Sequence, residues 1–171
     1  MELVKQLAQK KSAIIKMWFE KVINTYPIDT AQFLKNQKDP FANPVGQNSL
    51  QSLQDIFDLA LGGFDPTTAR SLIDPIIRIR AIQDFKPSEA VGFMFELKSI
   101  IRETVTVDAK ERQNLEDLNA LDRRIDQLSL LAFDIYMQCR EKILDLKANE
   151  MRARTYAAFS RAGLIKEPDE S

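Results

Sequence analysis

Residues 115–139 read "LEDLNALDRRIDQLSLLAFDIYMQC", and this stretch decides the fold class. Its apolar side chains recur every three or four positions, which is the spacing of one face of an α-helix. The candidate seam consists of Leu115, Leu118, Leu121, Ile125 and Leu128. No strong helix breaker occurs between about residue 108 and Gly163. We therefore predict either one helix of about fifty residues or two helices with a bend.

A helical seam of this length has two interpretations. It can be a coiled-coil-like dimer seam or lever, or it can be the central helix of a bundle with a solvated end. Residues 128–137 are apolar nearly all round, which indicates burial on several sides. We expect residues 128–139 to lie in the core, and we expect a homodimer through the seam residues.

Helical spacing also dominates the rest of the chain, so the predicted fold class is all-α. The first stripe predicts a helix to about Thr25 and consists of Leu3, Leu7, Ile14, Ile15, Trp18, Phe19 and Val22. Residues 38–48, "KDPFANPVGQN", are the most turn-rich stretch. Asp65-Pro66 predicts a capped helix start, Pro75 a kink or restart with Asp74 as a new cap, and Pro87 a further start.

These signals together predict a single helical bundle of about five to seven helices with a long C-terminal helix. We expect one domain over residues 1–163, followed by a disordered tail over residues 164–171. The 171 residues include 24 Lys+Arg and 25 Asp+Glu, so no basic surplus favours nucleic-acid binding. No run approaches the roughly 18 apolar residues of a membrane span, and a single cysteine fits a reducing compartment. We expect a cytoplasmic protein without direct membrane insertion.

The composition excludes much catalytic chemistry. The chain has no histidine, which removes histidine-based triads, histidine zinc sites and ordinary haem ligation. It has no glycine-rich phosphate loop. Cys139 falls on the apolar seam and is expected to be a buried structural thiol. We expect no enzyme, no cofactor and no catalytic metal.

Residues 75–85, "PIIRIRAIQDF", place two arginines among isoleucines. On a helix Arg78 and Arg80 point about 200° apart, so at least one must lie near the border of the apolar surface. Arg78 can pair with Asp74 and Arg80 with Asp84 at (i, i+4). One interpretation is that an arginine docks the "DPFANPVG" loop through its carbonyls and Asp39, with Phe41 entering the core. The other is a site for an anion, a carboxylate ligand or a partner. The candidate residues are Asp39, Phe41, Asn43, Arg78, Arg80, Gln83 and Asp84.

Three segments resemble a known family. They are "IIKMWFEKVINTYP" (residues 14–27), "FLKNQKDPFANPVG" (residues 33–46) and "RIRAIQDFKPSEAVGFMFELK" (residues 78–98). Together they resemble the N-terminal domain of RsbRD-type RsbT co-antagonists over roughly residues 10–145. The resemblance implies a haem-free, globin-like input domain of stress signalling that pairs as a dimer. In related proteins an output module follows such a domain, whereas this chain ends soon after the long helix, so we expect a stand-alone copy.

Two classes of function remain. The first is a non-enzymatic sensor or adaptor that binds a protein partner and a small apolar or anionic ligand. The alternative is a structural accessory protein of a membrane redox complex that has no ligand of its own. An internal cavity favours the first class, and a solid core with an exposed apolar patch on the long helix favours the second.

Overall fold

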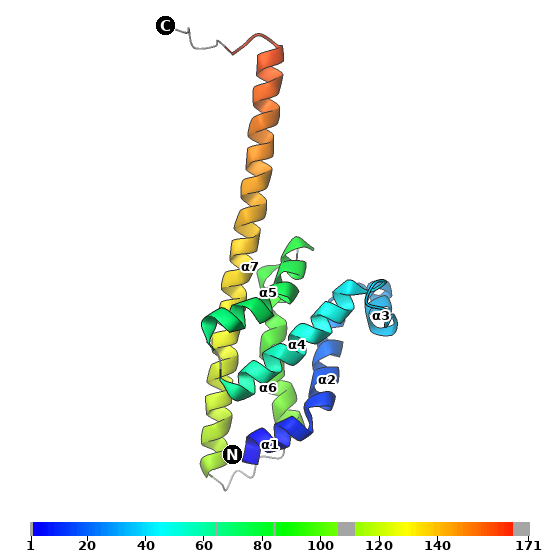
Figure 1. The fold of residues 1–171 in the computed structure, drawn as a ribbon, viewed down its shortest axis with the longest axis vertical. Helices are drawn as coiled ribbons and strands as arrows, with labels where there is room; N and C mark the ends of the chain where they lie inside the picture. Colours follow the sequence, from blue (N-terminus) through cyan, green and yellow to red (C-terminus); the bar gives the residue numbers. More distant parts are fainter. Residues whose placement is uncertain (1, 64, 84, 106–111, 166–171) are drawn as a thin grey trace.

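The fold is a bundle of α-helices from which one long helix projects (Figure 1). The computed structural model describes residues 2–63, 65–83, 85–105 and 112–165. These residues form seven helices and no strand, which confirms the predicted all-α fold with a long C-terminal helix. The helices are α1 (Glu2–Gln9), α2 (Lys11–Ile23), α3 (Ile28–Asn36), α4 (Pro44–Gly62), α5 (Pro66–Ile82), α6 (Pro87–Thr104) and α7 (Arg112–Arg161).

Proline at the first helical position marks the starts of α4, α5 and α6. The carboxylate of Asp65 caps α5 by accepting a hydrogen bond from the Thr68 amide at 2.7 Å, as predicted. The side chain of Asn43 caps α4 in the same way, accepting from the Gly46 amide at 2.8 Å. The helix α4 therefore begins at Pro44, inside the stretch that the sequence predicted to be a turn.

Two predicted helix boundaries were wrong. The first helix is divided into α1 and α2 at Lys10, which lets α1 pack against α7 while α2 packs against α4 and α6. Of the kink or restart predicted at Pro75, the restart is wrong, because the helix α5 continues through Pro75 to Ile82. Asp74 is consequently not a cap, and its carboxylate is paired with Arg78 instead.

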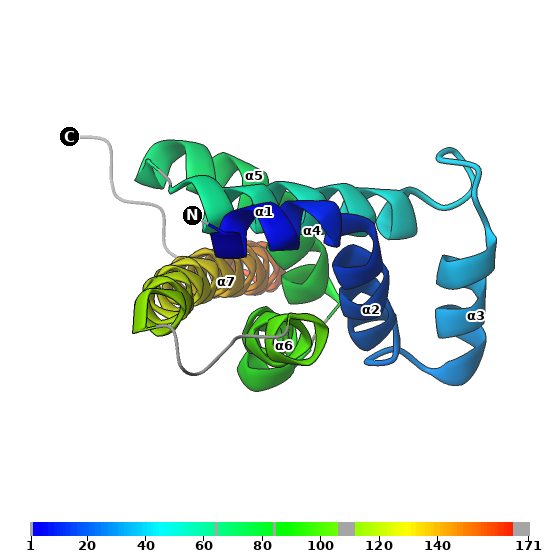
Figure 2. The ribbon, with the colours of Figure 1, turned by 90° about the horizontal axis from the view of Figure 1, so that it is seen from below.

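A single hydrophobic cluster joins α1, α2, α4, α5, α6 and the first half of α7. Trp18 is fully buried in it, and its indole N–H donates to the Phe93 carbonyl at 2.7 Å. From α7 the cluster takes Leu118, Leu121, Ile125, Leu128, Ala132, Ile135 and Tyr136. The helix α3 lies on the side of the bundle opposite α7 (Figure 2), and among the described helices it packs mainly against α2 and α4.

Beyond Arg140, whose Nη1 donates to the Ala81 carbonyl at 3.2 Å, the helix α7 leaves the bundle and continues alone (Figure 1). Its end is well defined, because Gly163 adopts a left-handed φ of 66° and the amides of Gly163 and Leu164 donate to the carbonyls of Ser160 and Phe159. This is a Schellman cap, in which glycine avoids the steric cost of positive φ. The expected tail falls largely on residues 166–171, which lie outside the described residues.

Candidate functional site

Arg80 is the buried arginine that the sequence required, with 1% of its surface exposed. Its Nε donates to the Ala90 carbonyl at 3.1 Å, and its Nη2 donates to the Glu89 carbonyl at 2.8 Å. Nη2 also donates to the Thr25 hydroxyl at 3.1 Å. The guanidinium thus ties together the end of α5, the first turn of α6 and the segment after α2.

Three aromatic rings surround the same guanidinium. Its central carbon lies 4.1 Å from the ring centre of Phe85, 5.4 Å from that of Phe93 and 5.7 Å from that of Tyr26. Such rings attract a cation through their negative faces. Burial lowers the pKa of Arg80 and raises that of Tyr26, while their mutual interaction opposes both shifts. An arginine nevertheless stays protonated in a protein, so a positive charge is held in an apolar cage.

The loop over residues 39–46 is docked by Asn43 and not by an arginine. Asn43 is buried, and its amide nitrogen donates to the Leu34 carbonyl at 2.9 Å and to the Gln37 carbonyl at 3.0 Å. The loop supplies its own donor because one amide can cap α4 with its oxygen and hold the preceding carbonyls with its nitrogen. The docking role predicted for Arg78 or Arg80 was therefore wrong.

Two other loop residues also differ from the expectation. Phe41 was predicted to enter the core but is 98% exposed. The carboxylate of Asp39 was expected to receive an arginine and instead accepts from the backbone amide of Phe41 at 2.9 Å. This short turn holds Phe41 outside, away from the core.

The other predicted site residues at the end of α5 and just after it do not lie in one common environment. Arg78 lies on the surface and forms the predicted (i, i+4) pair with Asp74, with N–O distances of 2.8 and 2.9 Å. Gln83 accepts a hydrogen bond from the Tyr26 hydroxyl at 2.8 Å. Asp84, the predicted partner of Arg80, lies outside the described residues.

A cavity of about 280 Å³ opens between α3 and the start of α4. Its walls are mostly apolar and include Phe33, Leu34 and Val45. Tyr26 and Gln83 also line it, so it adjoins the surroundings of Arg80. The sequence did not predict this cavity, because its walls come from α3, the following loop and the end of α5.

Most of the predicted dimer seam is part of the core. Leu118, Leu121, Ile125 and Leu128 are buried within the chain, and of the seam residues Leu115 alone is exposed. They cannot face a second copy unless the bundle opens. Only one side of residues 128–139 lies in the core, because Leu130, Phe133 and Met137 are exposed.

A different apolar face of α7 is accessible. We call it the outer stripe, and it consists of Leu130, Phe133, Met137, Leu144 and Met151, all exposed. At 100° per residue these side chains fall within an arc of about 60°. The outer stripe begins on the bundle and continues along the projecting part of α7.

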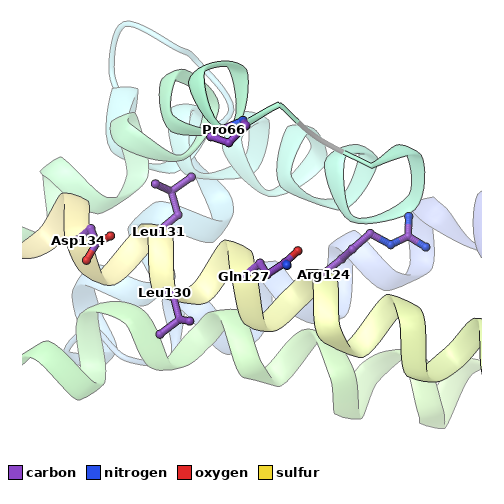
Figure 3. A pocket seen from close by; sticks show the side chains of 6 residues that line it. All are labelled: Pro66, Arg124, Gln127, Leu130, Leu131 and Asp134. Carbon is purple, nitrogen blue, oxygen red and sulfur yellow. The ribbon is translucent and has the colours of Figure 1, made fainter.

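A groove of about 570 Å³ lies beside the N-terminal end of the outer stripe, between the start of α5 and α7 (Figure 3). Leu131 extends from α7 toward Pro66 across it, while Arg124 and Gln127 follow along α7. Arg124 is held by the Leu61 carbonyl at 2.8 Å. Asp134 is the only acidic residue among the lining side chains, so the groove lacks a converging set of acid–base groups.

The described residues contain no group of three or more Cys, Asp or Glu side chains that could hold a metal ion. Burial raises the pKa of the Cys139 thiol, partly against the effect of Arg78, which disfavours the reactive thiolate. No described helix combines the length and the apolar character that crossing a bilayer demands.

Known proteins similar to this chain include one relative and one domain family. A protein of Archaeoglobus fulgidus, described as an uncharacterized protein, is 22% identical over 150 residues, which cover 84% of this chain and 85% of that protein. No solved structure matches the chain significantly. The family model of the RsbT co-antagonist protein rsbRD N-terminal domain matches residues 12–151. The chain therefore belongs to the RsbT co-antagonist rsbRD N-terminal domain family.

Proposed function

We propose that this chain is a non-enzymatic regulatory domain of stress signalling that acts through a protein–protein contact made by α7. Membership of a co-antagonist domain family supports the regulatory role. The observation that carries the proposal is the outer stripe, which leaves apolar side chains in solvent along a projecting helix. Such a stripe is also expected of the structural-accessory alternative, but the cavity between α3 and α4 favours the regulatory class. The partner is a second copy of this chain.

The projecting part of α7 gives a physical reason for a partner. Residues 141–161 extend about 30 Å at 1.5 Å per residue, and most of their side chains are exposed. An isolated helix of this length is marginal in water, since helices in proteins depend on the packing of an apolar face. Arg154 and Glu150 form an (i, i+4) pair, but such a pair contributes only about 0.3–0.5 kcal/mol.

The spacing of the outer stripe favours a helical partner of the same kind. Leu130, Met137, Leu144 and Met151 are seven residues apart, which is the repeat of a helix that packs against another helix over several turns. A surface that follows this repeat is self-complementary, so two copies can bury it against each other. A symmetric pair is also the commonest oligomer of soluble proteins.

Sedimentation equilibrium at tens of micromolar tests the proposal. The wild-type chain is expected to be a dimer, and the double variant Leu144→Glu/Met151→Glu is expected to be a monomer whose bundle still unfolds cooperatively. The matched control is Asn149→Glu/Ala153→Glu, which adds the same two charges about 140° or more around the helix. It should remain a dimer. A monomeric wild type, or equal dissociation of both double variants, would contradict the proposal.

A further inference from the structure

Arg80 has a donor that nothing in the described part of the chain uses. Its Nη1 is buried and has no hydrogen-bond partner there. Nε and Nη2 are occupied by the carbonyls of Glu89 and Ala90 and by the Thr25 hydroxyl, so the two N–H groups of Nη1 are left over. No carboxylate of the described residues forms an ion pair with Arg80. Burying a charge without a counter-charge costs folding free energy. The retention of such a group, here without an ion pair among the described residues, therefore points to a role beyond stability.

The cavity between α3 and α4 shares Tyr26 with the surroundings of Arg80. Tyr26 belongs to both places, since it lines the cavity and its ring centre lies 5.7 Å from the guanidinium carbon. Gln83 also lines the cavity, one turn after Arg80 on the same helix. The hydrogen bond between the Tyr26 hydroxyl and Gln83, 2.8 Å long and exposed, joins two of the residues that line the cavity.

We infer that this cavity is a binding site for a small carboxylate with an apolar body, whose carboxylate accepts hydrogen bonds from Nη1 of Arg80. The apolar body lies against Phe33, Leu34 and Val45. One water occupies about 30 Å³ in the liquid, so the 280 Å³ cavity holds on the order of ten non-hydrogen atoms. This inference concerns the end of the bundle away from α7 and does not rest on dimer formation.

The chemistry of the site selects this class of ligand. The open donor belongs to a guanidinium, whose planar N–H groups match the two oxygens of a carboxylate. The cavity walls are largely apolar and would leave most oxygens of an inorganic phosphate without donors. A neutral amide of the same shape would add no negative charge beside a buried cation that forms no ion pair with the described carboxylates.

Entry of the carboxylate requires the Tyr26–Gln83 hydrogen bond to open, because Nη1 itself is not exposed. The Tyr26 hydroxyl and the Gln83 amide group then become additional donors to the bound oxygens. The helix α3 makes few contacts with the bundle and can adjust to the apolar part of the ligand.

Thermal denaturation and titration calorimetry with benzoate, octanoate, benzamide and inorganic phosphate test the inference on the full chain. Benzoate or octanoate at millimolar concentration is expected to raise Tm by several degrees, since a ligand that binds only the folded state stabilises it. Benzamide and phosphate are expected to leave Tm unchanged. Equal stabilisation by benzamide, or no shift with either carboxylate, overturns the inference and leaves Arg80 a purely structural residue.

Variants locate the bound carboxylate without removing Arg80. Val45→Trp fills the cavity and should weaken carboxylate binding at least about tenfold, whereas Arg78→Ala, on the same helix but outside the cavity, should leave it unchanged. The Arg80 side-chain resonance in ¹H–¹⁵N spectra should move on adding benzoate. Unchanged affinity in Val45→Trp, or an unmoved Arg80 resonance, would refute the site.

Discussion

Replacing Arg80 with alanine is expected to destabilise the fold far more than the same change at Arg78. Arg80 is buried and loses three hydrogen bonds and three aromatic contacts. Truncating a large buried side chain costs about 3–5 kcal/mol. Arg78 is 59% exposed and loses a surface pair that is worth about 0–1 kcal/mol.

The two losses convert into well-separated melting temperatures. A change of 1 kcal/mol moves Tm by about 2–4 °C in a protein of this size. Arg80→Ala should therefore lower Tm by about 6–20 °C and Arg78→Ala by less than about 4 °C. Arg80→Lys should fall between them, because it keeps the stem and the charge but loses the planar fork.

Circular dichroism melts and urea titrations of the three variants measure these differences. The slope of unfolding free energy against urea concentration should stay constant, which shows that the change lies in stability and not in the compactness of either state. Equal Tm values for Arg80→Ala and Arg78→Ala would refute the argument that the cage around Arg80 holds α5, α6 and the end of α2 together.

Three further predictions follow from other contacts. In Gly46→Ala the new Cβ would lie 2.7 Å from Oδ1 of Asn43, so the Asn43 cap of α4 must move. The free energy of unfolding, measured by urea titration, should fall by about 1–2 kcal/mol. An unchanged urea midpoint would contradict this. Leu121→Glu would bury a carboxylate in the core and should abolish cooperative melting. A variant that folds normally but is monomeric would instead support the dimer seam that the sequence predicted. Because burial raises the pKa of Cys139, alkylation at pH 8 should be slower than that of free cysteine and should quicken as pH rises; equal rates would disprove it.

The periodicity of apolar residues predicted the fold class because each helix buries one stripe. The (i, i+4) spacing likewise predicted the Asp74–Arg78 pair, and the geometry of the helix predicted that one of the two arginines is buried. These are local properties, and the local sequence contains all the information they need.

The partners of Arg80 could not be predicted, since they are backbone carbonyls, a hydroxyl and aromatic rings brought together from α6 and from the segments that follow α2 and α5. The role of Asn43 in holding the loop over residues 39–46 had a local signal in the sequence, because an asparagine before proline is typical of a helix start. From the sequence, this asparagine was instead interpreted as part of a turn. The outer stripe could not be separated from the core-facing stripe in the sequence, because the two alternate along the same helix. Residues 128–137 were therefore predicted to be buried on several sides.

Because α7 is one continuous helix, a small tilt of its buried half moves its distant end by a larger distance. Its first half is fixed in the core up to Tyr136, and its Schellman-capped end near Arg161 lies about 38 Å further on at 1.5 Å per residue. A tilt of only about 5° at the core would carry that end about 3 Å sideways, enough to shift one side-chain layer against a neighbouring helix. A small repacking of α5 and α6 around Arg80 would thus be amplified at the distant tip of the molecule.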